Sequence, residues 1–220
     1  EFLEEAVVLA RSGAVSLLID APYVRPGFVL ERELMRAAEQ SARVEQQEVV
    51  DLRRGTDLLL ARPDVDPKRI AYVGHSFGAH AGALLAGVDK RIQSFVLMAG
   101  SYADQENAFD LNTPEMQQVR AQMGEDRLRQ FFSQHSWDDP VYYAPHSSPA
   151  AVFLQFASKD QSDDRARQYY GRFGNPKQMK IYMAAHALNA AARMDRVEWL
   201  ARRLSLRAVD RTALEKIPPL

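Results

Sequence analysis

A serine in a glycine-flanked pentapeptide is the first candidate for chemistry in this chain. Residues 74–78 have the form G-x-S-x-G, with Ser76 at the centre. The apolar residues 69–73 before it indicate a buried strand, and the alanine-rich residues 79–86 after it indicate a helix. A serine between a strand and a helix lies on a sharp turn that exposes its hydroxyl above the sheet. This context predicts that Ser76 is a nucleophile.

A serine nucleophile needs a histidine base nearby. His186 directly follows the last apolar run, residues 179–184, at the strand end where parallel sheets collect reactive groups. We therefore predict that His186 is the base. The other four histidines fit this role less well: His75 cannot easily reach the neighbouring hydroxyl, His80 is expected to pack on the following helix, and His135 and His146 have no strand context.

The base in turn needs a carboxylate that orients its ring. Asp160 follows another apolar run, residues 151–157, and gives the chain order serine, aspartate, histidine that is expected on such a sheet. Three aspartates compete with it: Asp104 after an earlier run, and Asp163 and Asp164, which have the position of first-turn residues in a helix. We predict that Asp160 is the orienting carboxylate.

These segments resemble the α/β-hydrolase superfamily. The resemblance is carried by the pentapeptide, by Ser158-Lys159-Asp160 and by Ala185-His186. Residues 65–73 and 19–22 are similar to the dienelactone hydrolase and prolyl-oligopeptidase-like branches. The resemblance implies a cofactor-independent serine hydrolase that forms an acyl-enzyme on Ser76 and hydrolyses it with water activated by His186.

The oxyanion of such a reaction needs two preorganised N–H donors. The resemblance implies that the backbone N–H of Phe77 is one and that a His-Gly-rich loop after an earlier strand supplies the other. The chain has no such loop, and residues 1–10 look like the helix that would follow it. The first three strands of the superfamily therefore look absent, including one between residues 14–20 and 70–73. We expect the sequence to be an N-terminally incomplete fragment of a longer protein.

Strand and helix signals alternate along the chain. The predicted strands are residues 14–20, 70–73, 92–99, 151–157 and 179–184, and the predicted helices are residues 2–10, 31–61, 77–86, 114–133, 163–170 and 188–204. This alternation predicts a three-layer α/β/α sandwich with a mostly parallel sheet, the α/β-hydrolase fold without its first strands, in one domain that spans residues 1–220.

The long interval between strands is residues 101–148, which form either a cap-like insertion over the pocket or a plain crossover with a long loop. Tyr23, Arg25 and Tyr102 follow predicted strands and are candidates to line a substrate cleft. The alternative for these three is a solvated arginine and packed tyrosines.

Composition narrows the classes of function. The net charge of −1 gives no field that would attract nucleic acid, and no apolar run has the length of a membrane span. The chain has no cysteine, and its histidines and acidic residues lack the spacing of a metal site, so no metal or cofactor is expected. The expected partner is a small-molecule ester or acyl substrate. Two alternatives remain: an oligopeptidase-like serine peptidase, and a non-catalytic binding protein with a hydrolase fold.

Overall fold

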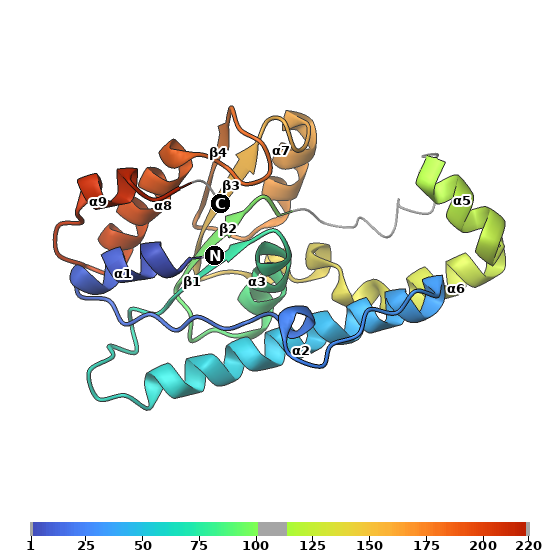
Figure 1. The fold of residues 1–220 in the computed structure, drawn as a ribbon, viewed down its shortest axis with the longest axis horizontal. Coiled ribbons are helices and arrows are strands. Elements are labelled where there is room, and N and C mark those ends of the chain that lie inside the picture. The colour runs from blue at the N-terminus through green and yellow to red at the C-terminus, as the bar shows by residue number, and fades with distance from the viewer. Residues whose placement is uncertain (1, 101–113, 219–220) are drawn as a thin grey trace.

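A parallel sheet forms the centre of the protein (Figure 1). The computed structural model describes residues 2–100 and 114–218. In these ranges the strands are β1 (Ala71–His75), β2 (Ser94–Met98), β3 (Ala151–Ala157) and β4 (Lys177–Tyr182), and they pair in the order β1-β2-β3-β4. Every pair is parallel, so all four carboxyl ends meet at one edge of the sheet.

Helices cover both faces of this sheet, which confirms the predicted three-layer sandwich. The helices of the described ranges, apart from short 3₁₀ turns, are α1 (Leu3–Arg11), α2 (Leu34–Leu60), α3 (Phe77–Val88), α5 (Pro114–Met123), α6 (Glu125–His135), α7 (Asp163–Arg172), α8 (Ala190–Arg203) and α9 (Arg211–Glu215). Side chains of α2, α3 and α7 pack on one face, and those of α1 and α8 pack on the other.

The two faces follow from the alternation of side chains along β2. Phe95 and Leu97 are buried in the cluster with α3 and α7, whereas Val96 and Met98 are buried in the cluster with α8. Successive residues of a strand point to opposite faces, so a strand covered on both sides has to be apolar throughout. This is why the buried strands are readable as continuous apolar runs in the sequence.

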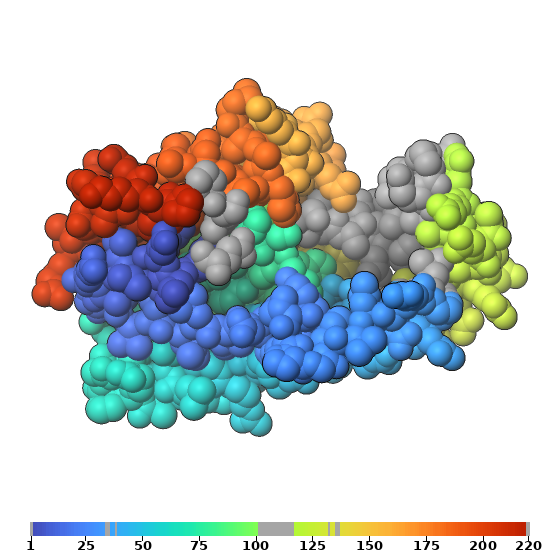
Figure 2. Space-filling view, viewed as in Figure 1, coloured from blue at the N-terminus to red at the C-terminus, as the bar shows by residue number. Residues whose placement is uncertain are grey.

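The predicted strand at residues 14–20 is wrong. This segment has no strand pairing, and Leu17 and Leu18 are 43% and 48% exposed. A cavity of about 570 Å³ is lined by this segment and by β1, at the place where the resemblance expects a further strand. An apolar run becomes a strand only where a neighbour accepts its backbone hydrogen bonds, and the described residues place none there. Figure 2 shows this N-terminal part of the chain (blue) at the surface.

Two helix predictions also need adjustment. Residues 31–61 contain one continuous helix, α2, whereas residues 114–133 contain two, because the chain turns at Gly124 with a φ of +75°. Figure 1 shows α5 and α6 projecting away from the sheet. Residues 101–113, which include Tyr102 and Asp104, lie outside the described residues, and the cap-like insertion stays a prediction.

A buried ion cluster joins the N-terminal helix to α8. The Arg196 guanidinium donates two hydrogen bonds to the Glu5 carboxylate, and Arg193 Nε lies 3.4 Å from Glu5 Oε1. All three side chains are at most 6% exposed. Arg193 also donates to the Ile217 carbonyl oxygen at 2.6 Å. One carboxylate thus connects α1, α8 and the C-terminal residues.

A second buried carboxylate, Glu48 on α2, lies beside the 570 Å³ cavity. It is 5% exposed, and one of its oxygens has no hydrogen-bond partner in the described part of the chain. Burial raises the pKa of Glu48 to about 7, the nearby Arg25 guanidinium partly opposes this, and the Asp51 carboxylate adds to it. The ionised form is therefore unfavourable in the folded state.

We predict that Gly82→Ala destabilises the protein. A Cβ at Gly82 on α3 would lie 2.4 Å from Tyr72 Cε1 and 2.6 Å from Leu97 Cδ2, so the helix has to move off the sheet. We expect the free energy of unfolding to fall by about 1–3 kcal/mol in urea titrations. The matched control is Gly171→Ala on α7, where a Cβ meets nothing within 4 Å and the gain is about 0.5 kcal/mol. Equal effects of the two substitutions would contradict the packing argument.

We also predict that Glu48→Gln stabilises the protein at high pH. The pKa of Glu48 is about 7 in the folded state and 4.5 as a free side chain, so the folded state binds the proton more tightly. The free energy of unfolding then falls as the pH rises from 4.5 through 7. We expect Glu48→Gln to raise the free energy of unfolding by about 1–2 kcal/mol at pH 8 and to change it little at pH 4.5. Glu39→Gln, at an exposed position of the same helix, is the control and should change neither value.

Candidate active site

The turn between β1 and α3 holds Ser76 in a strained conformation. Its φ of 54° and ψ of −113° lie where non-glycine residues are rare. The Ser76 amide donates to the Met98 carbonyl oxygen on β2 at 2.9 Å, which fixes the turn to the sheet. The hydroxyl makes no capping hydrogen bond to α3 and lies at the wall of a cavity. The strain is thus held by the surrounding structure, and the hydroxyl is left accessible.

Gly74 allows the strand and the helix to meet at this turn. A Cβ at Gly74 would lie 2.3 Å from the Gly78 carbonyl oxygen, a distance that no side chain can occupy. The Tyr72 hydroxyl donates to the same oxygen at 2.6 Å, which ties the first turn of α3 back to β1. Gly74 is therefore required by backbone contact, whereas a Cβ at Gly78 would meet only the Tyr72 hydroxyl, at 3.4 Å.

An aspartate and a histidine meet at the ends of the next two strands. The His186 Nδ1 atom lies 2.8 Å from Asp160 Oδ2. Asp160 follows β3 and His186 follows β4, and the Lys159 amide donates to the Ala184 carbonyl oxygen at 3.1 Å between the two loops. Because β3 and β4 are parallel neighbours, their ends bring residues 26 positions apart into contact.

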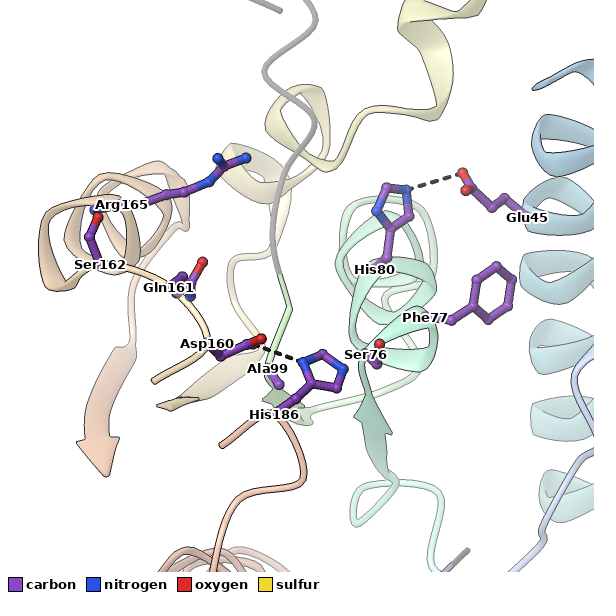
Figure 3. Close-up of a pocket in the computed structure, with 10 residues that line it drawn as sticks. All are labelled: Glu45, Ser76, Phe77, His80, Ala99, Asp160, Gln161, Ser162, Arg165 and His186. Carbon is purple, nitrogen blue, oxygen red and sulfur yellow. Dashed lines mark hydrogen bonds and ion pairs between the residues drawn. The ribbon is translucent and has the colours of Figure 1, made fainter. Parts of the chain in front are cut away.

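The cavity beside these residues brings the three predicted side chains together. Its volume is about 690 Å³, and its lining consists of Glu45, Ser76, Phe77, His80, Ala99, Asp160, Gln161, Ser162, Arg165 and His186. Figure 3 shows the His186 ring between Asp160 and Ser76. The side chains of Ser76 and His186 line the same space without a hydrogen bond between them. Such contacts often form only when substrate is bound.

His75 supports the loop that carries His186. Its Nε2 atom lies 2.8 Å from the His186 carbonyl oxygen, and the two rings are 4.9 Å apart. His75 comes from the end of β1, next to Ser76, so this contact links the strand of the serine to the loop of the histidine. The sequence indicated only that His75 could not reach the serine hydroxyl; the supporting contact was not predicted.

Two of the three candidates for substrate binding, Tyr23 and Arg25, make contacts outside the cavity lining. Tyr23 packs edge-on against Phe77 with ring centroids 5.0 Å apart, and neither Tyr23 nor Arg25 is among the residues that line the 690 Å³ cavity. Arg25 lies 2.6 Å from the Asp51 carboxylate and donates twice to the Asp20 carbonyl oxygen. Arg25 thus fastens residues 14–20 to α2. Tyr102 lies outside the described residues.

Sequence reasoning missed the polar wall of the cavity. Glu45 from α2 and Arg165 from α7 line it, and so does His80, which was expected only to pack. The position of His80 four residues after Ser76 is the one signal in the sequence, because it places His80 one turn along the helix that follows the serine. Glu45 and Arg165 carry no such signal, since their helices approach the cavity only in the folded chain.

Asp163 and Asp164 occupy the first turn of α7, as expected, with Ser162 as the N-cap. No three His, Asp or Glu side chains are grouped as metal ligands in residues 2–100 and 114–218. Within the same ranges, every helix is too short or too polar to cross a bilayer. The arrangement around Ser76 places a hydroxyl, an imidazole and a carboxylate at one cavity.

Part of the chain matches a known protein family. Residues 52–151 match the family model described as "BAAT / Acyl-CoA thioester hydrolase C terminal", a stretch that includes Ser76 and ends before Asp160. It covers fewer than half of the 220 residues. No curated protein sequence matches the chain at a significant level.

Solved structures resemble the protein over most of its length. Acetyl xylan esterase 1 from Thermoanaerobacterium sp. JW/SL YS485 is 15% identical with a TM-score of 0.62, over 83% of this chain and 61% of that one. The acetyl xylan esterase from Paenibacillus sp. R4 is 17% identical with a TM-score of 0.61, over 72% and 53%. The α/β hydrolase GrgF from Penicillium sp. sh18 is 16% identical with a TM-score of 0.53, over 73% of each chain. At these identities the likeness concerns the fold, and the chain spans less than two thirds of either esterase.

Proposed function

We propose that this chain, which has the α/β-hydrolase fold, is a serine hydrolase that cleaves a carboxylic ester or a related acyl substrate. The observation that carries the proposal is the 2.8 Å contact between His186 Nδ1 and Asp160 Oδ2 in the cavity that also contains Ser76. A histidine held in this way presents its other ring nitrogen for proton transfer.

In the first half of the proposed reaction, His186 takes the proton of the Ser76 hydroxyl while Oγ bonds to the substrate carbonyl carbon. The carbonyl electron pair moves to oxygen, which becomes the oxyanion. When the carbonyl re-forms, the bond to the leaving alcohol breaks, and the alcohol takes the proton from His186. The acyl group remains on Ser76. The Asp160 carboxylate stabilises the imidazolium that forms on the way.

In the second half, His186 takes a proton from water as the water oxygen bonds to the acyl carbon. The bond to Ser76 Oγ then breaks, and Oγ recovers the proton. The free carboxylic acid leaves, and the enzyme returns to its starting state.

The backbone amide of Phe77 is the proposed donor to the oxyanion. Phe77 is the first residue of α3, where backbone N–H groups have no acceptor within the helix and the helix dipole favours negative charge. A donor fixed before the reaction stabilises the oxyanion without reorganisation, and one such donor contributes about 3–4 kcal/mol to lowering the barrier.

The comparisons favour two kinds of substrate bond for cleavage, an oxygen ester and a thioester. Two similar structures are acetyl xylan esterases, which favours an oxygen ester. The matching family model is named for a thioester hydrolase, which favours a thioester as the second candidate. Ser76, His186 and Asp160 could cleave either bond in the same way, because the leaving alcohol or thiol receives its proton from His186.

We predict that a fluorophosphonate probe labels the full-length protein at Ser76. The probe reacts only with a serine activated by a base, so Ser76→Ala abolishes labelling. Mass spectrometry of the labelled peptide identifies the modified residue. Ser158→Ala, which alters the serine beside Asp160, is the matched control and should label as the wild type does. Labelling that persists in Ser76→Ala would falsify the assignment.

We predict that Asp160→Asn lowers kcat by about 10³–10⁴-fold with a p-nitrophenyl ester, because the amide favours the wrong tautomer of His186. KM should change by less than about threefold, since Asp160 acts through the histidine. The control is Asp163→Asn in the first turn of α7, which should retain kcat. Equal activities of Asp160→Asn and the wild type would exclude Asp160 from the relay.

A further inference from the structure

His80 lies one helical turn above the candidate nucleophile. Its amide donates to the Ser76 carbonyl oxygen at 3.1 Å, and its side chain lines the same cavity. Figure 3 shows the rings of His80 and His186 on different sides of Ser76. The serine is thus flanked by two imidazoles with separate surroundings.

Two protein groups hold the His80 ring from one side. Its Nε2 atom lies 3.0 Å from the Asp138 carbonyl oxygen and 3.1 Å from the Glu45 carboxylate. The side chains of His80 and Glu45 are 21% and 15% exposed. The Nδ1 atom has no partner in the part of the chain that the structure describes, and Figure 3 shows it on the side of the ring turned away from Glu45. One ring nitrogen is fixed, and the other is available to a ligand.

We propose that His80 Nδ1 binds a carboxylate on the acyl part of the substrate. This inference rests on the proposed function. The leaving group has to lie beside His186, because it receives the proton of that residue. The part of the cavity near His80 is therefore open to the acyl chain.

The charge on His80 suits this ligand. Burial lowers the pKa of His80. The Glu45 carboxylate, the Asp138 carbonyl oxygen and the charge of Asp138 all raise this pKa, and together they outweigh burial, so the pKa of His80 is raised overall. The protonated ring donates from Nδ1 to an anionic oxygen. Arg165 lines the same cavity and adds a positive charge, whereas Phe77 and Ala99 are its two apolar lining residues. The cavity is poorly matched to a plain aliphatic chain.

The acyl group has to be short, because its carbonyl carbon bonds to Ser76 and its carboxylate has to reach a ring on the first turns of the following helix. A glutaryl group, with three methylenes between its two carboxyl carbons, is a suitable probe. We therefore expect monoesters of short dicarboxylic acids to be better substrates than alkanoyl esters of equal length.

The test compares kcat/KM for p-nitrophenyl glutarate monoester and p-nitrophenyl hexanoate in the full-length protein. We expect the ratio of the two values to fall about tenfold or more in His80→Gln, because a hydrogen bond to a charged group is lost. His146→Gln, an exposed histidine outside the cavity, is the matched control. A ratio within twofold of the wild type in His80→Gln overturns the inference.

Glu45→Gln tests the charge on the ring. Without the carboxylate the pKa of His80 falls, so the ratio at pH 8 should drop several-fold and recover at lower pH. Glu39→Gln on the same helix is the control. In the wild type the ratio should fall as the pH rises through the raised pKa of His80. The charged groups around this ring are Glu45 and Asp138, and Asp160, His186 and Arg165 lie across the cavity. Titration of His186 changes kcat/KM for both substrates equally, so it cancels in the ratio. A ratio that is independent of pH in the wild type counts against the proposal.

A binding measurement separates this inference from the proposed function. Titration calorimetry of monomethyl glutarate and methyl pentanoate with Ser76→Ala requires no hydrolysis. We expect monomethyl glutarate to bind more tightly, and the difference to disappear in Ser76→Ala with His80→Gln. Equal binding of the two esters overturns the inference even if the p-nitrophenyl ester is hydrolysed by the wild type. Activity that survives Ser76→Ala overturns the proposed function and leaves the binding result to decide on His80.

Discussion

The close approach of β1 and α3 at Ser76 is the constraint on which the site depends. Gly74 lies so near the Gly78 carbonyl oxygen that a Cβ cannot fit, and Ser76 is held at a φ of 54°. The cost of this conformation is of the order of 1–3 kcal/mol, and the Tyr72 and Met98 hydrogen bonds help to offset it. The result is a hydroxyl at the carboxyl edge of the sheet, next to the loops that follow β3 and β4.

The helix α2 contributes a carboxylate to each of two cavities, the one at Ser76 and the one beside residues 14–20. Glu45 lies at the cavity of Ser76, and Glu48, one turn further, lies at the second cavity beside residues 14–20. Glu45 lies 3.1 Å from the His80 ring, whereas Glu48 is buried and has a raised pKa. The difference follows from burial: Glu48 is 5% exposed, and the Arg25 guanidinium only partly opposes the resulting rise in its pKa.

The strands were predictable because burial on both faces makes them apolar throughout, as in residues 151–157. The same reasoning failed for residues 14–20, which are equally apolar in sequence. A strand is a property of pairing, and this segment has no strand beside it: Ile19 approaches Gly55 of α2, while Leu17 and Leu18 are exposed. Composition cannot distinguish these two outcomes, because the presence of a neighbouring strand is not encoded in the run itself.

The sequence by itself determined the elbow around Ser76 and the candidates Asp160 and His186, since a pentapeptide between strand and helix and two residues after strands are local features. Only the tertiary structure decided that Asp160 and His186 are in contact, that His75 supports the loop of His186, and that Glu45 and His80 form a wall of the cavity. The physical reason is that these contacts join helices and loops far apart in the chain, whose distances are set by packing across the sheet and leave no local pattern.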